Sequence, residues 1–334
     1  MALADFPLIE DFGDPAAEAR ACRSDCALFD FSFLECARLQ GSGAKGVVEA
    51  FTGRSLAAMD VGKIHYALRV NRAGAIEADL TVWRTGEDAY EVMSGRRADI
   101  ADLLGQAGSG VAVDDLAGNV AVFALQGPNA LAALGRLGDI ARIERLSYFS
   151  FSAAILRGIA CRVGRLGYTG EPGFEIIAPH LQARDLWETL SAYARPAGFI
   201  AADMLRIEAG FVLFSNEFRL PVSPREAGLE RFHRSADLPH WELTLISFRA
   251  AADALRLPWQ PSGELRRPTE PGEIAVTSAC RSNAAGGVLG LGYVPADTDF
   301  DAVLHDPTGT FRVIRRTPLP FYDTAKRRPR VAWR

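Results

Sequence analysis

Residues 63–95 contain three apolar stretches separated by two short polar turns, and this pattern constrains the fold more than any other feature of the chain. The turns fall at 71–74 and 85–88 and are made of residues such as Asn, Asp and Gly that favour tight turns. Three strands joined in this way form an antiparallel meander. Residues 145–178 repeat the pattern, so we expect two antiparallel sheets.

Helical segments flank both meanders, which makes the chain an α+β protein. Residues 14–29 predict a helix with Asp14 as its N-cap and Pro15 at the first helical position. A strand is expected over 29–41. Further helices are expected at 44–53, at 96–108, from about 128, at 181–198 and at 201–211.

The last third of the chain has a different character. Residues 257–272 are rich in Pro, Gly and charged side chains, as either a linker or a long loop would be. Several short strand-like stretches follow them, which predicts a small β domain.

Composition excludes several classes of function. A formal net charge of −4 provides no overall basic field for nucleic acid or anionic lipid. The N-terminus lacks a signal-peptide pattern and no apolar run is long enough to span a bilayer, so the expected location is the cytoplasm. The one dense basic run, 325–334, fits a solvated tail and a ligand contact equally well.

The five cysteines and five histidines are scattered, and neither set has the spacing of a metal site. We expect the cysteines to be reduced thiols and the protein to hold no metal. The chain also lacks a nucleophilic triad, a phosphate-binding loop and a dinucleotide fingerprint.

One hairpin carries candidate binding residues. In "GRLGYTGEPGFEII" (164–177), Tyr168 and Glu175 flank the turn sequence "TGEPG" and can reach one face of the hairpin. A solvated Glu175 is the simpler interpretation. If the side chain instead points inward from the apolar strand, it needs a partner, and a guanidine-like ligand edge would supply two N–H donors.

Two further acidic sites stand out. Asp79 lies in the apolar stretch "ADLTVW", where it is either a strand-start acid beside the turn or a functional group. Asp203 and Arg206 lie on the apolar helix "DMLRIEAG", where an i,i+3 ion pair is the simpler interpretation.

Five motifs in order together resemble the glycine cleavage system T-protein (aminomethyltransferase) family. They are "ALFDFSFLECARLQGSGA", "FALQGPNA", "LGYTGEPGFEI", "DMLRIEAGF…FSNEFRLPVSPREAGL" and "TSACRSNAAGGVLGLGYV", which span about residues 18–325. "GAIEADLTVWR" and "PLPFYDTAKRRPR" are also similar to the folate-binding domains of sarcosine and dimethylglycine dehydrogenases.

The resemblance implies three small domains around a central channel that holds tetrahydrofolate. Two are helix-plus-antiparallel-sheet domains and the third is a small C-terminal β-barrel. On this basis we divide the chain into a folate-binding region, 1–240, whose two subdomains are intertwined, and a barrel, 241–334.

The resemblance also implies roles for individual residues. Asp79 matches the family's catalytic aspartate, and Arg327 or Arg328 matches a basic position that faces the folate tail or the substrate. The pterin pocket is expected to contain Tyr66, Tyr168, Glu175 and Arg206.

The implied activity is a tetrahydrofolate-dependent one-carbon transfer of the aminomethyltransferase or amine demethylase type. The alternatives are an O- or S-demethylase on the same fold, and a folate-binding protein without transfer chemistry. Ala78, Ala202 and the segment after "PREAGLERF" depart from the T-protein pattern, which affects docking of a lipoyl carrier protein. The expected partners are a small-molecule donor and either that carrier or an amine oxidase or dehydrogenase, with no nucleic acid or membrane.

Overall fold

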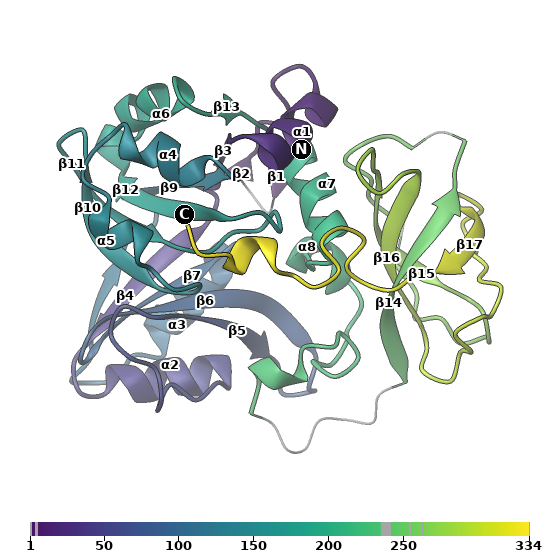
Figure 1. Cartoon of the computed structure of the whole chain (residues 1–334). Coiled ribbons are helices and arrows are strands. Elements are labelled where there is room, and N and C mark those ends of the chain that lie inside the picture. Colours follow the sequence, from purple (N-terminus) through teal and green to yellow (C-terminus); the bar gives the residue numbers. More distant parts are fainter. Residues whose placement is uncertain (1, 4–5, 235–241, 254, 262–263, 334) are drawn as a thin grey trace.

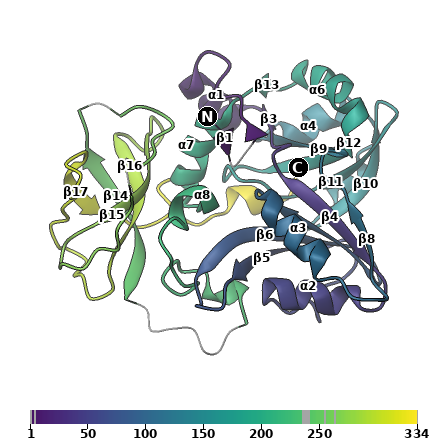
Figure 2. The same ribbon diagram turned by 180° about the vertical axis from the view of Figure 1, so that it is seen from behind.

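A computed structural model describes the whole chain except residues 1, 4–5, 235–241, 254, 262–263 and 334. Two larger sheets lie face to face, each with helices on its outer side, and a smaller sheet stands beside them (Figures 1 and 2). This arrangement confirms the α+β class expected from the two meanders.

The five-stranded sheet contains the first meander. Its strands, in spatial order, are β5 (Ile64–Val70), β6 (Ile76–Gly86), β7 (Ala89–Ser94), β4 (Glu35–Gln40) and β8 (Ala112–Asp115). Two helices, α2 (Ala44–Thr52) and α3 (Arg97–Gly105), cover its outer face through an apolar cluster. Helix α3 begins one residue after the start of the helix expected at 96–108. The first ends at Gly53, whose φ of +61° closes the helix in the left-handed region that glycine tolerates.

The six-stranded sheet contains the second meander. Its strands, in order, are β10 (Phe151–Leu156), β11 (Ile159–Gly164), β12 (Gly173–Pro179), β9 (Val120–Gln126), β3 (Ala27–Asp30) and β13 (Arg195–Pro196). Its outer side carries α4 (Ala130–Gly135) and α6 (Ala183–Ser191), packed through a second apolar cluster. Two short helical segments, α5 (Ala141–Glu144) and η1 (His180–Gln182), complete this region.

The segment expected to form one strand over 29–41 forms two. Strand β3 ends at Asp30 and β4 begins at Glu35, and they belong to different sheets. Ser32 makes the break, because its amide donates to the Asp30 carboxylate and its hydroxyl accepts from the Val122 amide. The chain therefore crosses between the two sheets here, which an alternating pattern alone does not reveal.

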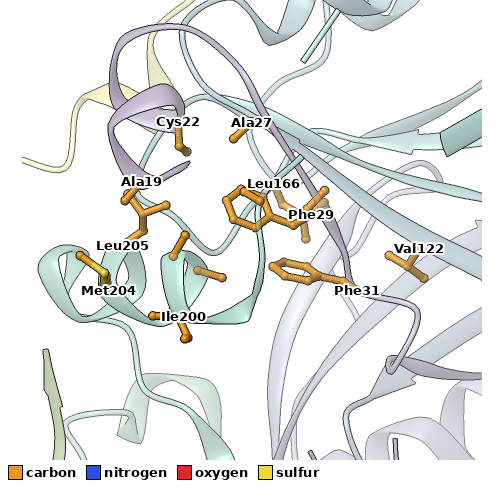
Figure 3. Close-up of a cluster of buried hydrophobic side chains, with 14 of the residues drawn as sticks. Ala19, Cys22, Ala27, Phe29, Phe31, Val122, Leu166, Ile200, Met204 and Leu205 are labelled. Carbon is orange, nitrogen blue, oxygen red and sulfur yellow. The ribbon is translucent and has the colours of Figure 1, made fainter. Parts of the chain in front are cut away.

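Helices α1 (Pro15–Ser24) and α7 (Phe199–Ala209) pack against the inner side of β3 (Figure 3). Asp14 caps α1 as predicted, although the helix is shorter than the expected 14–29. Figure 3 shows Met204 and Leu205 of α7 in the same apolar cluster as Phe29 and Phe31, and all four are buried.

The small sheet has the strand order β15 (Ala275–Arg281), β16 (Val288–Pro295), β14 (Leu243–Ala251) and β17 (Arg312–Arg316). Leu304 pairs with Ile314 of β17, and His305 pairs with Glu273 beside β15, so the two edges are joined into a small barrel. The chain between β14 and β15 of this one sheet includes 257–272, and the described residues of that range belong to a loop within the domain, not to a linker between domains.

The remaining elements connect these parts: β1 (Ala2–Leu3), β2 (Phe6–Pro7), α8 (Phe214–Glu217), η2 (Glu230–Phe232) and η3 (Arg328–Arg330). After β17 the chain leaves the barrel and returns to the six-stranded sheet (Figure 1). The division of the chain at residue 240 stays a prediction. The residues after β17 do not remain with the barrel but pack on the six-stranded sheet of the first region.

Candidate functional site

Tyr66 and Asp79 come together on the inner face of the five-stranded sheet. In the β5–β6 ladder Tyr66 lies opposite Thr81 and Leu68 lies opposite Asp79, which places both side chains diagonally on one face. The Tyr66 hydroxyl donates a hydrogen bond of 3.1 Å to Oδ2 of Asp79. Two residues predicted to share a pocket are thus in direct contact.

Burial changes the acidity of both groups. Burial raises the pKa of Asp79 to about 6, although the hydrogen bond from Tyr66 opposes the change. Burial and the nearby Asp79 charge raise the pKa of Tyr66 well above its usual value. Tyr66 therefore stays a neutral donor, while Asp79 can take up and release a proton near neutral pH.

Tyr168 lies beside this pair in the loop between β11 and β12. Its ring stacks on Phe211 with centroids 6.0 Å apart, and its hydroxyl donates to the carbonyl of Val212. Burial raises the pKa of Tyr168 well above the usual value; the Arg206 charge opposes this and the Asp79 charge adds to it. The Tyr168 hydroxyl is thus already hydrogen-bonded within the protein, and only the ring is available for an apolar contact with a ligand.

Glu175 lies on the facing sheet and has no protein partner. It sits on β12 between Gly164 of β11 and Ala124 of β9, and only 7% of the residue is exposed. Within the described part of the chain, its carboxylate makes neither a hydrogen bond nor an ion pair. Burial alone raises the pKa of Glu175 to about 7.

The strand pattern explains why Glu175 faces inward. Its neighbours Phe174 and Ile176 belong to the outer cluster under α4 and α6, whereas Ile177 belongs to the cluster between the sheets. Because side chains alternate along a strand, Glu175 shares the inner face with Ile177. Gly164, next to it, lies so close to Trp83 of the facing sheet that a Cβ would come within 2.3 Å of the indole.

Glu175 and Asp79 therefore lie on the facing sides of the two larger sheets. Trp83, near Glu175, is four residues along β6 from Asp79, which is roughly 13 Å in an extended strand. The pKa of Glu175 responds to burial alone, so the two carboxylates do not form a coupled pair. The channel between them, where a flat ligand would fit, stays a prediction.

Four cations without carboxylate partners gather beside Tyr66. The ring of Phe232 lies 4.9 Å from that of Tyr66, with the Arg231 and Arg54 guanidinium groups 4.6 Å and 5.3 Å from its centre. The Lys326 ammonium lies 5.3 Å from the centre of the Phe211 ring, which stacks on Tyr168. Burial lowers the pKa of Lys326, and the charges of Arg231 and Arg330 lower it further. None of the four has an ion pair among the described residues. We call Arg54, Arg231, Lys326 and Arg330 the cation cluster.

Arg206, predicted as a pterin contact, is held by protein groups, and its role toward a pterin stays a prediction. It is fully buried, and its guanidinium donates to Asp203 at 2.8 Å, to Glu217 at 3.0 Å and to Ser278 at 2.6 Å. Burial by itself would lower its pKa, but the charges of Glu217 and Asp203 raise it. The ion pair with Asp203 at i,i+3 is present, as the simpler interpretation of the sequence expected. The Arg206 guanidinium thereby connects α7 with α8 and β15.

Arg327 and Arg328 also lie differently from the expected tail contacts. Arg327 is exposed, and Arg328 donates to Glu171 at 2.7 Å. Two other residues of the same basic run, Lys326 and Arg330, belong to the cation cluster instead. Sequence reasoning found the basic run but not which of its members face the site, and it missed Arg54 and Arg231 entirely.

A groove of about 400 Å³ opens at the start of β6. Glu77, Arg96, Phe214 and Phe218 are among its lining residues. Two of the lining residues, Ile76 and Phe218, pack in one apolar cluster with Tyr66 and Leu68, which lie on the face that carries Asp79. The groove therefore opens on the side of the sheet that carries Asp79.

Other chemistries find less support. All five cysteines are buried and free. In the part of the chain that the structure describes, no group of His, Cys, Asp or Glu is arranged to hold a metal ion. Among the same residues, no helix is long and apolar enough to cross a membrane.

Comparisons with known proteins find a matching family model and several similar relatives. The GCVT N-terminal domain model matches residues 9–236. Over 94% of its length the chain is 30% identical to an aminomethyltransferase of Rubrobacter xylanophilus, covering 87% of that protein. It is 29% identical to one from Streptomyces avermitilis, covering 92% of that protein, and 33% identical to one from Chlorobaculum parvum, covering 61%.

A solved structure confirms the fold. The glycine cleavage system aminomethyltransferase T of Bartonella henselae superposes with a TM-score of 0.80, over 97% of this chain and 94% of that one, at 23% identity. The family model covers more than half of the chain and a relative 30% identical covers nearly all of it. The chain therefore belongs to the aminomethyltransferase, or glycine cleavage T-protein, family.

Proposed function

We propose that this protein is an enzyme that transfers a one-carbon unit from an amine donor to tetrahydrofolate. The observation that carries the proposal is Glu175, a nearly buried carboxylate with no partner among the residues that the structure describes, on a sheet that faces the Tyr66–Asp79 pair. Membership of the aminomethyltransferase family supports the reaction class. The relatives above favour neither ether or sulfonium demethylation nor folate binding without transfer.

The unpaired carboxylate suits the amino-pyrimidine edge of a pterin. A carboxylate has two oxygens that can accept two parallel N–H donors, and such charge-assisted pairs are strong and directional. Glu175 offers this surface at a site that excludes most water. When bound, tetrahydrofolate would supply the nitrogen nucleophile that accepts the carbon.

Asp79 is suited to the reacting end of the same space. Tyr66 occupies Oδ2, while Oδ1 has no side-chain donor among the described residues and is available to a proton. With a pKa of about 6 the carboxylate is mostly ionised at neutral pH, so it stabilises positive charge that develops on the donor. The hydrogen bond from Tyr66 fixes its orientation.

The cation cluster is suited to the carboxylates of the folate tail. Arg54, Arg231, Lys326 and Arg330 have no acidic partner in the described structure. Phe232 connects the first two to Tyr66, and Phe211 connects Lys326 to Tyr168. Unpaired cations beside an apolar ring provide a subsite for an anionic aromatic ligand. This assignment replaces Arg327 and Arg328 as the tail contacts.

The donor is assigned to the groove at the start of β6. That groove opens on the Asp79 side of the sheet, and no member of the cation cluster is among its described lining residues, so a donor there would not occupy the subsite of the folate tail. We propose an aminomethyl group presented by a lipoyl carrier protein, because the aminomethyltransferase relatives favour that donor over an amine oxidase product.

Tetrahydrofolate titration tests the acceptor assignment. We expect the native protein to bind tetrahydrofolate and Glu175→Gln to bind at least about a hundredfold more weakly, since two charge-assisted hydrogen bonds are lost. Glu144→Gln is the matched control, because Glu144 is exposed and has no side-chain partner. Absence of binding to the native protein, or equal binding by Glu175→Gln, would contradict the proposal.

Turnover with two donors tests the donor assignment. We expect transfer from an aminomethyl-loaded lipoyl carrier and little from a free secondary amine with an amine oxidase. The reverse result would assign the donor to amine oxidation and leave the acceptor pocket unchanged.

A further inference from the structure

The chain that follows the barrel returns to the folate-binding region. We call residues 317–333 the C-terminal strap. Figures 1 and 2 show it leaving the barrel and running along α8 to the six-stranded sheet, where the chain ends near β9 and β12. Two members of the cation cluster, Lys326 and Arg330, lie on it, so its position decides whether the cluster is complete.

An ion-pair cluster holds the middle of the strap. The Glu171 side chain is fully buried and accepts from Arg23 at 2.9 Å and from Arg328 of the strap at 2.7 Å. Arg328 also donates to the Arg23 carbonyl at 3.1 Å. The ring of Tyr322 lies 4.0 Å from the Arg23 guanidinium and 5.4 Å from that of Arg328.

The end of the strap has a second attachment. Trp333 stacks on Phe174 of β12, with ring centroids 5.3 Å apart and an interplanar angle of 20°. Arg165 donates to the carbonyl of Val331, and Pro329 is buried between the two attachments. Lys326 and Arg330 therefore lie on either side of the Arg328 anchor, on a segment fixed at both ends.

The anchor and the pterin carboxylate share one turn. Glu171 belongs to the turn that precedes β12, and Glu175 is four residues later on that strand. The turn is itself rigid, because the Thr169 hydroxyl donates to Gln126 and accepts from the Glu171 amide. A single turn thus connects the end of the ligand space marked by Glu175 with the segment that carries the cations.

We propose that Arg23, Glu171 and Arg328 are positioning residues that hold the C-terminal strap so that Lys326 and Arg330 face the carboxylate tail of the acceptor. They set specificity for a pterin that carries an anionic tail over one that does not. None of the three contacts the space between Asp79 and Glu175, so they act through the strap. This inference rests on the proposed function.

Binding of two probes tests the inference: tetrahydrofolate, and 6-methyltetrahydropterin, which lacks the tail. We expect Glu171→Gln and Arg328→Gln to weaken tetrahydrofolate binding by about tenfold, because release of the strap displaces both Lys326 and Arg330, and to leave tetrahydropterin binding within about twofold. Arg328→Lys, which keeps a charge able to reach Glu171, should restore part of the loss. Glu188→Gln, which removes an exposed ion pair with Arg184, is the control.

A double-mutant cycle separates positioning from general structural damage. If Arg328 acts through Lys326, the combination of Arg328→Gln and Lys326→Gln weakens tetrahydrofolate binding by less than the product of the two single effects. Equal weakening of both probes, or an unchanged ratio between them, would overturn the inference. Arg328→Gln decides the question if Glu171→Gln does not fold. A native protein that binds neither probe would instead contradict the proposed function.

Discussion

Glu171 and Glu175 lie four residues apart in one hairpin, are both almost fully buried, and have opposite surroundings. Glu171 accepts from two arginines, whereas Glu175 has no partner among the described residues. A buried charge that is fully paired holds the structure together, and a buried charge that is unpaired costs stability unless a ligand completes it. The pairing of a buried charge therefore indicates its role better than its burial does.

The same distinction separates the basic residues. Arg206 donates to Asp203, Glu217 and Ser278 and is inaccessible, while the four members of the cation cluster have no acidic partner in the described structure. Arg206 is like Glu171, because both are buried charges that are paired within the protein and stabilise the fold. The cation cluster is like Glu175, because its charges have no partner of opposite sign among the described residues and are available to a ligand.

Removal of Arg206 tests whether buried charges that are paired within the protein stabilise the fold. We expect it to lower the free energy of unfolding more than any of the changes that follow. Arg206→Met leaves Asp203 and Glu217 buried without their cation, so we expect the free energy of unfolding to fall by about 3–5 kcal/mol. Denaturant unfolding measures it. Arg327→Met, which removes an exposed cation without a carboxylate partner, should change stability by less than about 0.5 kcal/mol. Similar losses for both variants would contradict the distinction.

Neutralising Asp79 tests the reacting end of the site. We expect Asp79→Asn to bind tetrahydrofolate within a few fold of the native protein and to lose about a hundredfold or more in turnover, because a proton acceptor and charge stabiliser is removed. Steady-state kinetics with parallel binding measurements separate the two effects. Asp60→Asn, on an exposed turn, serves as the control. Full turnover by Asp79→Asn would remove its catalytic role.

The pH dependence of stability distinguishes Glu175 from a paired carboxylate. Burial raises its pKa from 4.5 to about 7 in the folded state, so the folded protein binds this proton more tightly than the unfolded chain does. Its contribution is fully present below pH 4.5 and is lost as the pH rises to 7. We expect the stability of the native protein relative to Glu175→Gln to fall by about 1–3 kcal/mol over that window. A constant difference would contradict an unpaired carboxylate.

Single changes in the cation cluster should have the smallest effects. We expect Arg231→Gln, Lys326→Gln and Arg330→Gln each to weaken tetrahydrofolate binding by about twofold to fivefold, as partly exposed charge contacts do. The effects should shrink as salt increases, because exposed charges are screened. Arg327→Gln should leave binding unchanged, and an equal loss there would mean that the effect is not specific to the cluster.

The sequence allowed prediction of the parts that depend on local patterns. The meanders, the Asp14 cap and the 201–211 helix follow from spacing and turn residues, and the structure has all of them. The crossing between β3 and β4 was missed because Ser32 makes it through a contact 90 residues away along the chain.

The site divides in the same way. Asp79 and Glu175 stood out because a carboxylate in an apolar strand is conspicuous, and the structure brings Tyr66 to Asp79. Membership of the cation cluster was not predictable, because Arg54, Arg231 and Lys326 come from distant segments that only the tertiary fold brings together. The role of Arg328 depends in turn on Glu171, a turn residue far from the C-terminus.

A crystal structure of the protein with tetrahydrofolate tests the central claim most directly. The account predicts both Glu175 oxygens within hydrogen-bond distance of the amino-pyrimidine N–H groups, with Asp79 at the reacting end and the tail beside Lys326 and Arg330. A pterin bound elsewhere, or a Glu175 carboxylate paired with a protein cation in the complex, would contradict it.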